Sequence, residues 1–332
     1  MKNKRNKLKI GLFGVGRFGT YHLENWLDIP EVELVGFCDT DSKIQKNIQK
    51  KYKLKYYTQK ELIEAVDIVD IVVPTVSHYE IAKDALKNGK HVFIEKTITQ
   101  TLKQIEELNE IAEKNGLQIG VGHIERVNPI FVKTTEKYKL NPNFIEITRL
   151  GKFNPLRGTD VSVVMELMVH DLDLLLYSVD SKIVNISAVG TKVLSDKHDI
   201  VNARIEFENG TVANITASRI SAKQERKMRV FQKNLYISID LLKNEANVYS
   251  LLKDGTNKKN SNSKILSFIP KNFPKNINYE KIQPKKYNAL RKELSTFVDC
   301  IMNNKQTPMN GIDGYKALEL ATKIIESMKK IK

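Results

Sequence analysis

Two segments of this sequence carry side chains able to move a proton during a reaction. In the first, Lys96 directly follows Glu95 and the apolar run His91–Ile94, which predicts a buried parallel strand. Ligands of open α/β sheets lie at the carboxyl ends of strands, so Lys96 is expected beside a ligand. A lysine becomes a base when burial or a nearby cation lowers its pKa from about 10.4 toward about 7. The alternative is a solvated lysine that simply follows a strand.

The second segment, residues 161–179, predicts a helix that is apolar nearly all round and therefore buried. Its ionisable residues are Glu166, His170, Asp171 and Asp173. Because unpaired buried charges are costly, these groups either line a cleft or form a structural network. Glu166 and His170 share a helix face, so His170 is a candidate general acid–base whose ring Glu166 or Asp173 orients. The alternative is a core histidine satisfied by its neighbours.

Residues 122–129 follow the last strand expected in the parallel sheet. Arg126 in this segment can hold an anionic group through two parallel hydrogen bonds. An ion pair between two domains is the alternative use of this arginine. Besides Lys96, the residues expected to contact a substrate are His123, Arg126, Asn128, Arg157, Asp171 and Asp173.

The start of the chain contains the element that would position these groups, a G-x-G-x-x-G turn between a strand and a helix. The apolar run Leu8–Phe13 predicts the strand, and the helix begins at the glycines. Gly14 makes the tight turn, Gly16 lets backbone N–H groups approach a pyrophosphate, and Gly19 permits close packing. Asp39 lies 20 residues past Gly19, where a carboxylate accepts hydrogen bonds from a ribose diol and repels a 2′-phosphate. The pattern predicts NAD binding; the alternative is a glycine-rich turn without a ligand.

A second motif, Pro-Thr-Val-Ser-His at residues 74–78, follows a strand expected over residues 67–73 and is predicted to border the nicotinamide ribose. Capping of its own helix is the alternative role of His78. The complete set of residues expected to bind NAD is Gly14, Gly16, Arg17, Phe18, Gly19, Asp39, Pro74, Thr75, His78 and Glu95.

Strand and helix patterns alternate as far as Gly122, which predicts right-handed βαβ crossovers and a parallel sheet. From Asn143 onward most apolar segments predict strands, with Asn209-Gly210 as a hairpin turn between two of them. The sequence therefore predicts an α/β Rossmann domain over residues 1–125 and an α+β domain with a mainly antiparallel sheet over residues 126–332. The other elements expected in the second domain are a loop over residues 253–286 and closing helices over residues 287–302 and 314–330.

Composition narrows the class of protein. The net charge is +15 over 332 residues, but the lysines are scattered and no recognition helix or zinc module is present, which argues against nucleic-acid binding. A basic protein suits an anionic small substrate such as a nucleotide sugar. No apolar run approaches the length of a membrane span. Cys38 and Cys300 fit a reduced cytoplasm, and the spacing of the histidines predicts no metal site.

Together these pieces resemble the Gfo/Idh/MocA oxidoreductases. The segments that carry the resemblance are the opening glycine turn, residues 74–78, residues 89–96, the helix with His170, and residues 308–314. The resemblance implies a Rossmann domain followed by an open-faced, mainly antiparallel sheet, which forms homodimers or homotetramers in that family. It also implies that Lys96, matching the lysine of the family's Glu-Lys-Pro motif, is catalytic, and that His170 assists it.

Two positions depart from the family pattern. Thr97 stands where the family has proline, and Glu166 stands where it usually has aspartate four residues before the histidine. The first departure removes a rigid residue next to Lys96, and the second lengthens an acidic side chain by one methylene group. Neither removes the proposed base.

A narrower resemblance, carried by residues 122–129 and 160–173, is to a branch that oxidises the 3-hydroxyl of UDP-N-acetylglucosamine in amino-sugar synthesis for lipid A; Val127 departs from a familiar phenylalanine. We therefore predict a cytoplasmic NAD-dependent dehydrogenase acting on a secondary alcohol of a sugar or nucleotide sugar. Two alternatives stay open. One is a dehydrogenase or reductase of another polyol, free sugar or small carbonyl compound, and the other is a non-catalytic NAD-binding protein that acts through partners.

Overall fold

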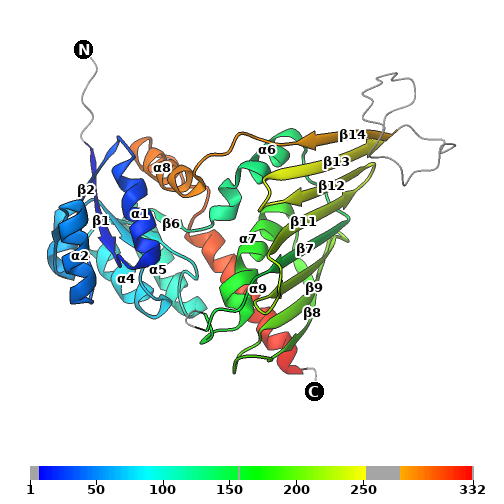
Figure 1. Cartoon of the computed structure of the whole chain (residues 1–332), viewed down its shortest axis with the longest axis horizontal. Coiled ribbons are helices and arrows are strands. Elements are labelled where there is room, and N and C mark those ends of the chain that lie inside the picture. Colours follow the sequence, from blue (N-terminus) through cyan, green and yellow to red (C-terminus); the bar gives the residue numbers. More distant parts are fainter. Residues whose placement is uncertain (1–6, 156–157, 252–276, 331–332) are drawn as a thin grey trace, which may run out of the picture. The chain divides into compact units, whose positions relative to one another are not determined.

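The computed structural model describes residues 7–155, 158–251 and 277–330. Its contacts divide the chain into two compact units. The first comprises Met1–Ile124 and Asn288–Glu319, and the second comprises Glu125–Tyr287 and Leu320–Lys332. Figure 1 labels most of the helices and strands of both. Each unit is described by itself below.

The first unit is built on a six-stranded sheet in which every pairing is parallel, in the order β3-β2-β1-β4-β5-β6. Its strands are β1 (Leu8–Phe13), β2 (Val32–Cys38), β3 (Lys55–Tyr56), β4 (Ile68–Ile71), β5 (His91–Ile94) and β6 (Ile119–Val121). This is the strand order of the dinucleotide-binding fold, and it reverses direction between β1 and β4. The predicted parallel sheet is confirmed, and the short β3 is an element that the sequence did not reveal.

Helices connect these strands and begin where the sequence supplies caps. They are α1 (Arg17–Leu27), α2 (Ser42–Tyr52), α3 (Gln59–Ala65), the 3₁₀ turn η1 (Thr75–Ser77), α4 (His78–Lys87) and α5 (Leu102–Lys114). Asp41 caps α2, and capping boxes begin α3 at Thr58 and α5 at Thr101. Each cap satisfies backbone N–H groups that a helix leaves unpaired at its start.

The first unit also contains a helix from late in the chain. The helix α8 (Ala289–Met302) buries Leu294 and Phe297 in one apolar cluster with Ile10 of β1 and Phe93 of β5. This corrects the expectation that all of residues 126–332 form the second domain. The expected boundary marks the place where the chain first passes from the first unit into the second. Residues 288–319 later return to the first unit, because the apolar face of α8 completes its core.

The second unit is built on an eight-stranded sheet in the order β14-β13-β12-β11-β7-β10-β9-β8. Only the central pair β7 and β10 is parallel within the described sheet, so the prediction of a mainly antiparallel sheet is confirmed. The strands are β7 (Phe144–Leu150), β8 (Ile183–Thr191), β9 (Ile200–Phe207), β10 (Val212–Ser218), β11 (Glu225–Gln232), β12 (Leu235–Asp240), β13 (Glu245–Leu251) and β14 (Ile277–Ile282).

Two details of this sheet bear on the sequence predictions. The expected hairpin turn at Asn209-Gly210 joins β9 to β10, and Gly210 has a φ of +83°, a conformation that favours glycine. The loop expected over residues 253–286 is wrong at its end, because β14 occupies part of it and pairs with β13. Tyr279 and Lys281 lie two residues apart in β14, which fits the period of a strand. The many lysines and asparagines of this region indicated a loop instead.

Helices cover one face of this sheet (Figure 1). They are α6 (Pro129–Lys137), a π-helical turn (Val164–Met168) that runs into α7 (Val169–Ser178), and the end of α9 (Gly311–Lys330). A large apolar core lies between these helices and the sheet. The helix α6 was not predicted, although Asn128 as cap followed by Pro129 is a recognised helix start. None of the described helices is long and apolar enough to cross a membrane.

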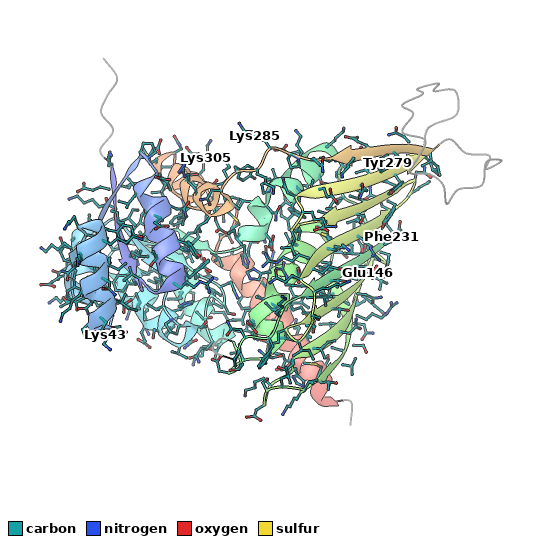
Figure 2. All side chains as sticks on the ribbon, viewed as in Figure 1. Lys43, Glu146, Phe231, Tyr279, Lys285 and Lys305 are labelled. Carbon is teal, nitrogen blue, oxygen red and sulfur yellow. The ribbon has the colours of Figure 1, made fainter. Side chains whose placement is uncertain are left out.

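The opposite face of the sheet carries a row of aromatic rings, which Figure 2 marks in part with Phe231 and Tyr279. The row runs across Phe144, Phe231, Tyr236, Tyr249 and Tyr279, with neighbouring centroids 4.7–5.6 Å apart. Since side chains alternate along a strand, these residues lie on the side away from the core residues of the same strands.

Candidate active site

The turn between β1 and α1 has the geometry that the glycine pattern predicts. Gly14 has a φ of +83°, and a Cβ built on it would lie 2.7 Å from the Val72 carbonyl oxygen. A Cβ on Gly19 would lie 1.9 Å from the Gly14 carbonyl oxygen, so the helix and the turn touch there. In contrast, a Cβ on Gly16 would meet no atom within 4 Å. Only glycine fits two of the three positions, and the third borders open space.

These residues fit a bound NAD. No side chain of the described residues caps α1 at Gly16, so the helix start is available to an anion such as a pyrophosphate. Asp39 lies at the end of β2, and its Oδ2 accepts a hydrogen bond of 2.8 Å from the Val15 amide. Arg17 is exposed and Phe18 is half-buried at the same helix start. NAD binding at this turn therefore agrees with the local geometry.

The motif after β4 has a buried histidine, whereas its first two residues are accessible. Pro74 is exposed and Thr75 is half-buried, as a ligand contact requires. His78 is buried, with Nε2 2.8 Å from the Val73 carbonyl oxygen and Nδ1 3.0 Å from the Thr97 carbonyl oxygen. Burial lowers the pKa of His78, although the carbonyl groups oppose the shift. Its ring therefore faces the backbone that follows Lys96.

Lys96 follows the carboxyl end of β5, as the sequence predicts, and its side chain is half-buried. The Lys96 amide donates a 3.2 Å hydrogen bond to Glu95 Oε2. The other carboxylate oxygen of Glu95 lies 3.3 Å from His22 Nε2. The Lys96–Thr97 peptide bond is cis. In the first unit, the predicted base and the predicted NAD-binding turn thus lie at the carboxyl ends of parallel strands of one sheet.

In the second unit, a π-helical turn carries Glu166, and His170 lies in the first turn of α7. The sequence predicted a single helix over residues 161–179, but the structure has these two elements there. Because a π turn is wider than an α-helical turn, it alters the spacing by which Glu166 and His170 were expected to share one face of an α-helix. Glu166 Oε2 accepts a 3.0 Å hydrogen bond from Arg219 Nη1. Arg219 is itself fixed by Asp199, 2.8 Å from its Nε.

The predicted substrate residues of α7 are bound to arginines. Asp173 holds Arg126 through two hydrogen bonds of 2.8 and 2.5 Å, and the Arg126 guanidinium lies 5.2 Å from the ring centre of Tyr177. Arg126 thus forms an ion pair inside the second unit, whereas the sequence alternative was a pair between domains. Asp171 accepts hydrogen bonds of 2.8–3.0 Å from Arg149.

Arg149 also contacts Glu125, 3.1 Å away, and all three of these side chains are buried. Burial by itself would raise the pKa of Glu125, but Arg149 and Arg226 outweigh it, and that pKa is lowered. Burial raises the pKa of Asp171 despite the attraction of Arg149. The sequence analysis missed Arg149, although an arginine at a core-facing position of an alternating strand was a readable signal.

Of the remaining predicted substrate residues, one contacts this cluster, one belongs to the first unit, and one lies outside the described residues. Asn128 caps α6 and donates a 3.0 Å hydrogen bond to Glu125. His123 is buried just after β6 in the first unit. Arg157 lies outside the described residues.

A pocket of about 180 Å³ in the second unit includes the candidate acid Glu166. Its charged and amide-bearing lining residues are Arg149, Lys152, Glu166, Arg219, Gln224 and Arg226. The Arg226 side chain is about half-exposed and Lys152 is exposed, so both are available to an anionic ligand. Arg219 and Arg226, like Arg149, were not among the predicted site residues.

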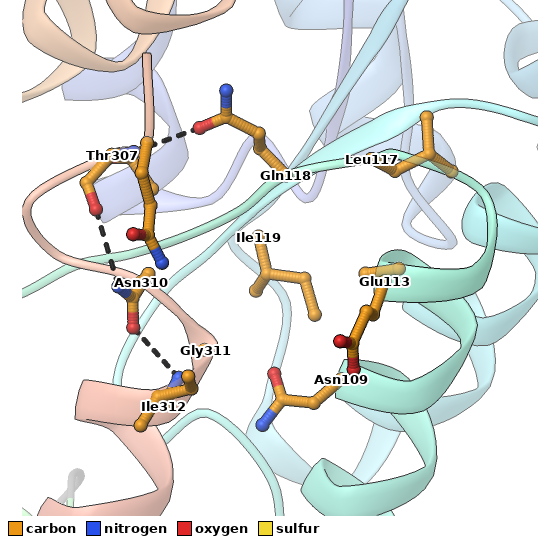
Figure 3. A pocket seen from close by; sticks show the side chains of 11 residues that line it. Asn109, Glu113, Leu117, Gln118, Ile119, Thr307, Asn310, Gly311 and Ile312 are labelled. Carbon is orange, nitrogen blue, oxygen red and sulfur yellow. Dashed lines mark hydrogen bonds between the residues drawn. The ribbon is translucent and has the colours of Figure 1, made fainter.

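A larger pocket of about 300 Å³ lies in the first unit between α5, β6 and residues 306–312 (Figure 3). Its wall contains Asn109, Glu113 and Asn310. None of the predicted catalytic or cofactor residues lines it. Its size alone therefore does not make it the active site.

Comparison with known proteins finds similarity to NAD-binding oxidoreductases. Residues 8–123 match the model of an oxidoreductase family with an NAD-binding Rossmann fold, and residues 152–237 match a GFO/IDH/MocA C-terminal domain. The UDP-N-acetylglucosamine 3-dehydrogenase of Acidithiobacillus ferrooxidans is 30% identical over 318 residues, covering 96% of each chain. The scyllo-inositol 2-dehydrogenase (NAD(+)) of Bacillus subtilis is 23% identical over 95% of this chain and 92% of its own.

Solved structures agree with this comparison. The structure of UDP-N-acetylglucosamine 3-dehydrogenase GnnA from Acidithiobacillus ferrooxidans superposes with a TM-score of 0.86 at 28% identity, covering 97% of this chain and 98% of that one. A levoglucosan dehydrogenase in complex with NADH and levoglucosan shares the fold, with a TM-score of 0.81 at 17% identity and 98% coverage of both chains.

Proposed function

Because this chain belongs to the Gfo/Idh/MocA family of NAD-binding oxidoreductases, we propose that it oxidises the 3-hydroxyl of a UDP-N-acetylhexosamine. The observation that carries the proposal is the full-length similarity to a UDP-N-acetylglucosamine 3-dehydrogenase, together with Lys96 at the carboxyl end of β5 in the NAD-binding unit. An amino-sugar biosynthetic role follows from that substrate.

In the proposed reaction Lys96 accepts the proton of the substrate hydroxyl. The hydrogen on the same carbon leaves with its bonding electrons, and the alcohol becomes a ketone. Bound NAD supplies the hydride acceptor. His170 shares or relays the proton, and Glu166, which Arg219 holds, orients His170. Positioned proton transfer of this kind contributes about 10²–10⁴-fold to a rate.

The pocket in the second unit supports an anionic substrate. Arg226 donates a 3.1 Å hydrogen bond to Glu125 but keeps 47% of its side chain exposed, and Lys152 is exposed beside it. A guanidinium and an ammonium at the rim of a pocket suit phosphate oxygens. This favours a nucleotide sugar over inositol or a free sugar.

The test is to incubate the purified protein with NAD and, separately, UDP-N-acetylglucosamine, UDP-N-acetylgalactosamine, N-acetylglucosamine and myo-inositol. A coupled aminotransferase removes the ketone so that NADH accumulates. NADH formation with a UDP-sugar, absent with the free sugar, supports the proposal. Turnover confined to myo-inositol or a free sugar favours the polyol alternative. NAD binding by calorimetry without turnover on a broad panel favours a non-catalytic NAD-binding protein.

We also propose a cytoplasmic homodimer or homotetramer that uses the aromatic face of the second sheet. Five neighbouring aromatic rings form a continuous row on the side away from the core, and four of them are half-buried, so the row offers a partner more apolar contact than scattered single residues do. Light scattering on the purified protein tests this. Tyr236→Lys is expected to reduce the measured mass toward that of one chain, and an unchanged mass contradicts this assignment of the face.

A further inference from the structure

The first unit buries a charged histidine beneath the proposed base. His22 on α1 is fully buried, with Nδ1 2.8 Å from Asp70 Oδ2 and Nε2 3.3 Å from Glu95 Oε1. The Trp26 indole donates a 2.6 Å hydrogen bond to the same Asp70 oxygen. Burial disfavours the charged ring, but the two carboxylates outweigh it and raise the pKa of His22 to about 10. At neutral pH the imidazolium therefore donates a hydrogen bond to Asp70 and lies within ion-pair distance of Glu95.

Glu95 connects this histidine to Lys96. One carboxylate oxygen faces His22, and the other accepts the Lys96 backbone N–H at 3.2 Å. A Cβ on Gly122 would lie 2.5 Å from Glu95 Oε1, so a glycine at the end of β6 makes room for this carboxylate. The Glu95 side chain is thus fixed from two sides, by His22 and by the shape of β6.

A second buried histidine holds the other side of Lys96. The His78 ring spans from the Val73 carbonyl oxygen, just after β4, to the Thr97 carbonyl oxygen. It also lies 3.3 Å from the Ile98 carbonyl oxygen. The ring therefore lies between residues 97–98 and the end of the neighbouring strand. Because its pKa is lowered, the neutral ring donates its single N–H to one of these carbonyl groups and packs against the others. This segment has no proline to restrain it, because Thr97 follows Lys96.

We propose that His22, acting through Glu95, and His78, acting through Thr97, are positioning residues that hold the backbone of Lys96 on both sides. This inference rests on the proposed function, in which Lys96 is the base. Neither ring needs to touch the substrate. The four-carbon lysine side chain is flexible, so the position of its amine depends on a rigid backbone at its root. A displacement of about 1 Å of a reacting group costs roughly 10²-fold in rate.

Kinetics of His22→Gln and His78→Gln test the proposal. Glutamine is uncharged, so at position 22 it cannot balance the charges of Asp70 and Glu95 as an imidazolium does. The kcat of each variant is expected to fall about 10- to 100-fold, while the NAD dissociation constant changes less than about 2-fold. The matched control is His91→Gln. His91 lies at the other end of β5, where its ring accepts the Gln118 N–H at 3.0 Å, and kcat should stay within about 2-fold.

A second readout does not depend on activity. Lysines methylated with ¹³C-formaldehyde give one NMR signal each, and the Lys96 signal is identified by its loss in Lys96→Arg. Its titration midpoint is expected to move in His22→Gln and His78→Gln but not in His91→Gln. An identical Lys96 titration in all proteins, with unchanged kcat, overturns the proposal. A wild-type protein that oxidises no sugar overturns the proposed function instead, and the Lys96 titration still tests the positioning.

Trp26→Phe keeps the test valid if a buried histidine variant does not fold. This change removes the indole N–H that fixes Asp70, together with part of a buried ring, and it leaves His22 and both carboxylates in place. Circular dichroism checks that the variant is folded. The kcat is expected to fall about 2- to 5-fold, with the Lys96 midpoint moving in the same direction as in His22→Gln. No change in either quantity, in a folded Trp26→Phe, counts against the proposal.

Discussion

Each unit of this protein buries a cation between two carboxylates, but the cation differs. In the first unit, His22 lies 2.8 Å from Asp70 and 3.3 Å from Glu95. In the second unit, Arg149 lies 2.8 Å from Asp171 and 3.1 Å from Glu125. We call these the histidine cluster and the arginine cluster. A histidine can lose its proton within the range of pH that proteins tolerate, and an arginine cannot.

The difference decides how each cluster responds to its surroundings. The pKa of His22 is about 10, so alkaline solution removes its charge. Burial opposes the charge of Arg149, but Asp171 and Glu125 raise its pKa further above an already high value. The arginine cluster is therefore a permanent ionic structure, and the histidine cluster is a titratable one that lies next to Lys96. Four predictions test this contrast, in order of decreasing expected effect.

Arg149→Met is expected to have the largest effect on stability. It leaves Glu125 and Asp171 buried without the cation between them, which lowers the free energy of unfolding by about 3–5 kcal/mol. Urea unfolding at neutral pH measures the loss. The matched control is Arg204→Met, which removes an exposed arginine 3.0 Å from Glu206, and its free energy of unfolding should change by less than about 1 kcal/mol. Equal losses in both variants would contradict a structural role for the arginine cluster.

Lys96→Ala removes the proposed base next to the histidine cluster and leaves the residues of the cluster in place. Turnover is expected to fall at least about 10²-fold, because the base is gone, while NAD still binds. The control is Lys152→Ala, an exposed lysine of the second unit. Its maximal turnover should remain nearly unchanged at saturating substrate. Initial rates and NAD calorimetry on both variants check this, and normal turnover in Lys96→Ala removes this lysine from the mechanism.

The pH dependence of stability distinguishes the two cations directly. The folded-state pKa of His22 is raised, so its stabilisation is fully present below the unfolded pKa of about 6.5 and is lost as pH rises toward about 10. The difference in free energy of unfolding between wild type and His22→Gln should therefore shrink between these two pH values. Over the same range the difference between wild type and Arg149→Met should stay constant. If the two differences change with pH in the same way, the contrast between the histidine cluster and the arginine cluster is wrong.

Arg226→Gln is expected to have the smallest effect and to concern binding. Arg226 touches the arginine cluster through Glu125 but is half-exposed in the pocket. Its loss is expected to raise the KM for a nucleotide sugar roughly 10-fold, with stability changed by less than about 1 kcal/mol. Steady-state kinetics with a UDP-sugar, and the inhibition constant of UDP, check this. Wild-type values of both quantities would place Arg226 outside phosphate recognition.

Local signals predicted a large part of the fold. The glycine turn, the alternation that ends at Gly122 and the turn at Asn209-Gly210 each depend on residues close together in sequence, and the structure confirms them. The π-helical turn at Glu166 and the return of α8 to the first unit were not predictable in this way. Both the π turn and the placement of α8 depend on which other elements pack against them. The helical pattern of apolar residues predicts a buried face but not the element that covers it.

The sequence by itself determined the class of fold, the NAD-binding turn and the position of Lys96 after a buried strand, because strand periodicity and glycine conformation are local properties. Only the tertiary structure decided which carboxylates surround His22 and Arg149. The residues of each pair lie 22 to 73 positions apart along the chain. Burial requires that each charge find a partner, but the topology of the strands and helices selects which partner it is.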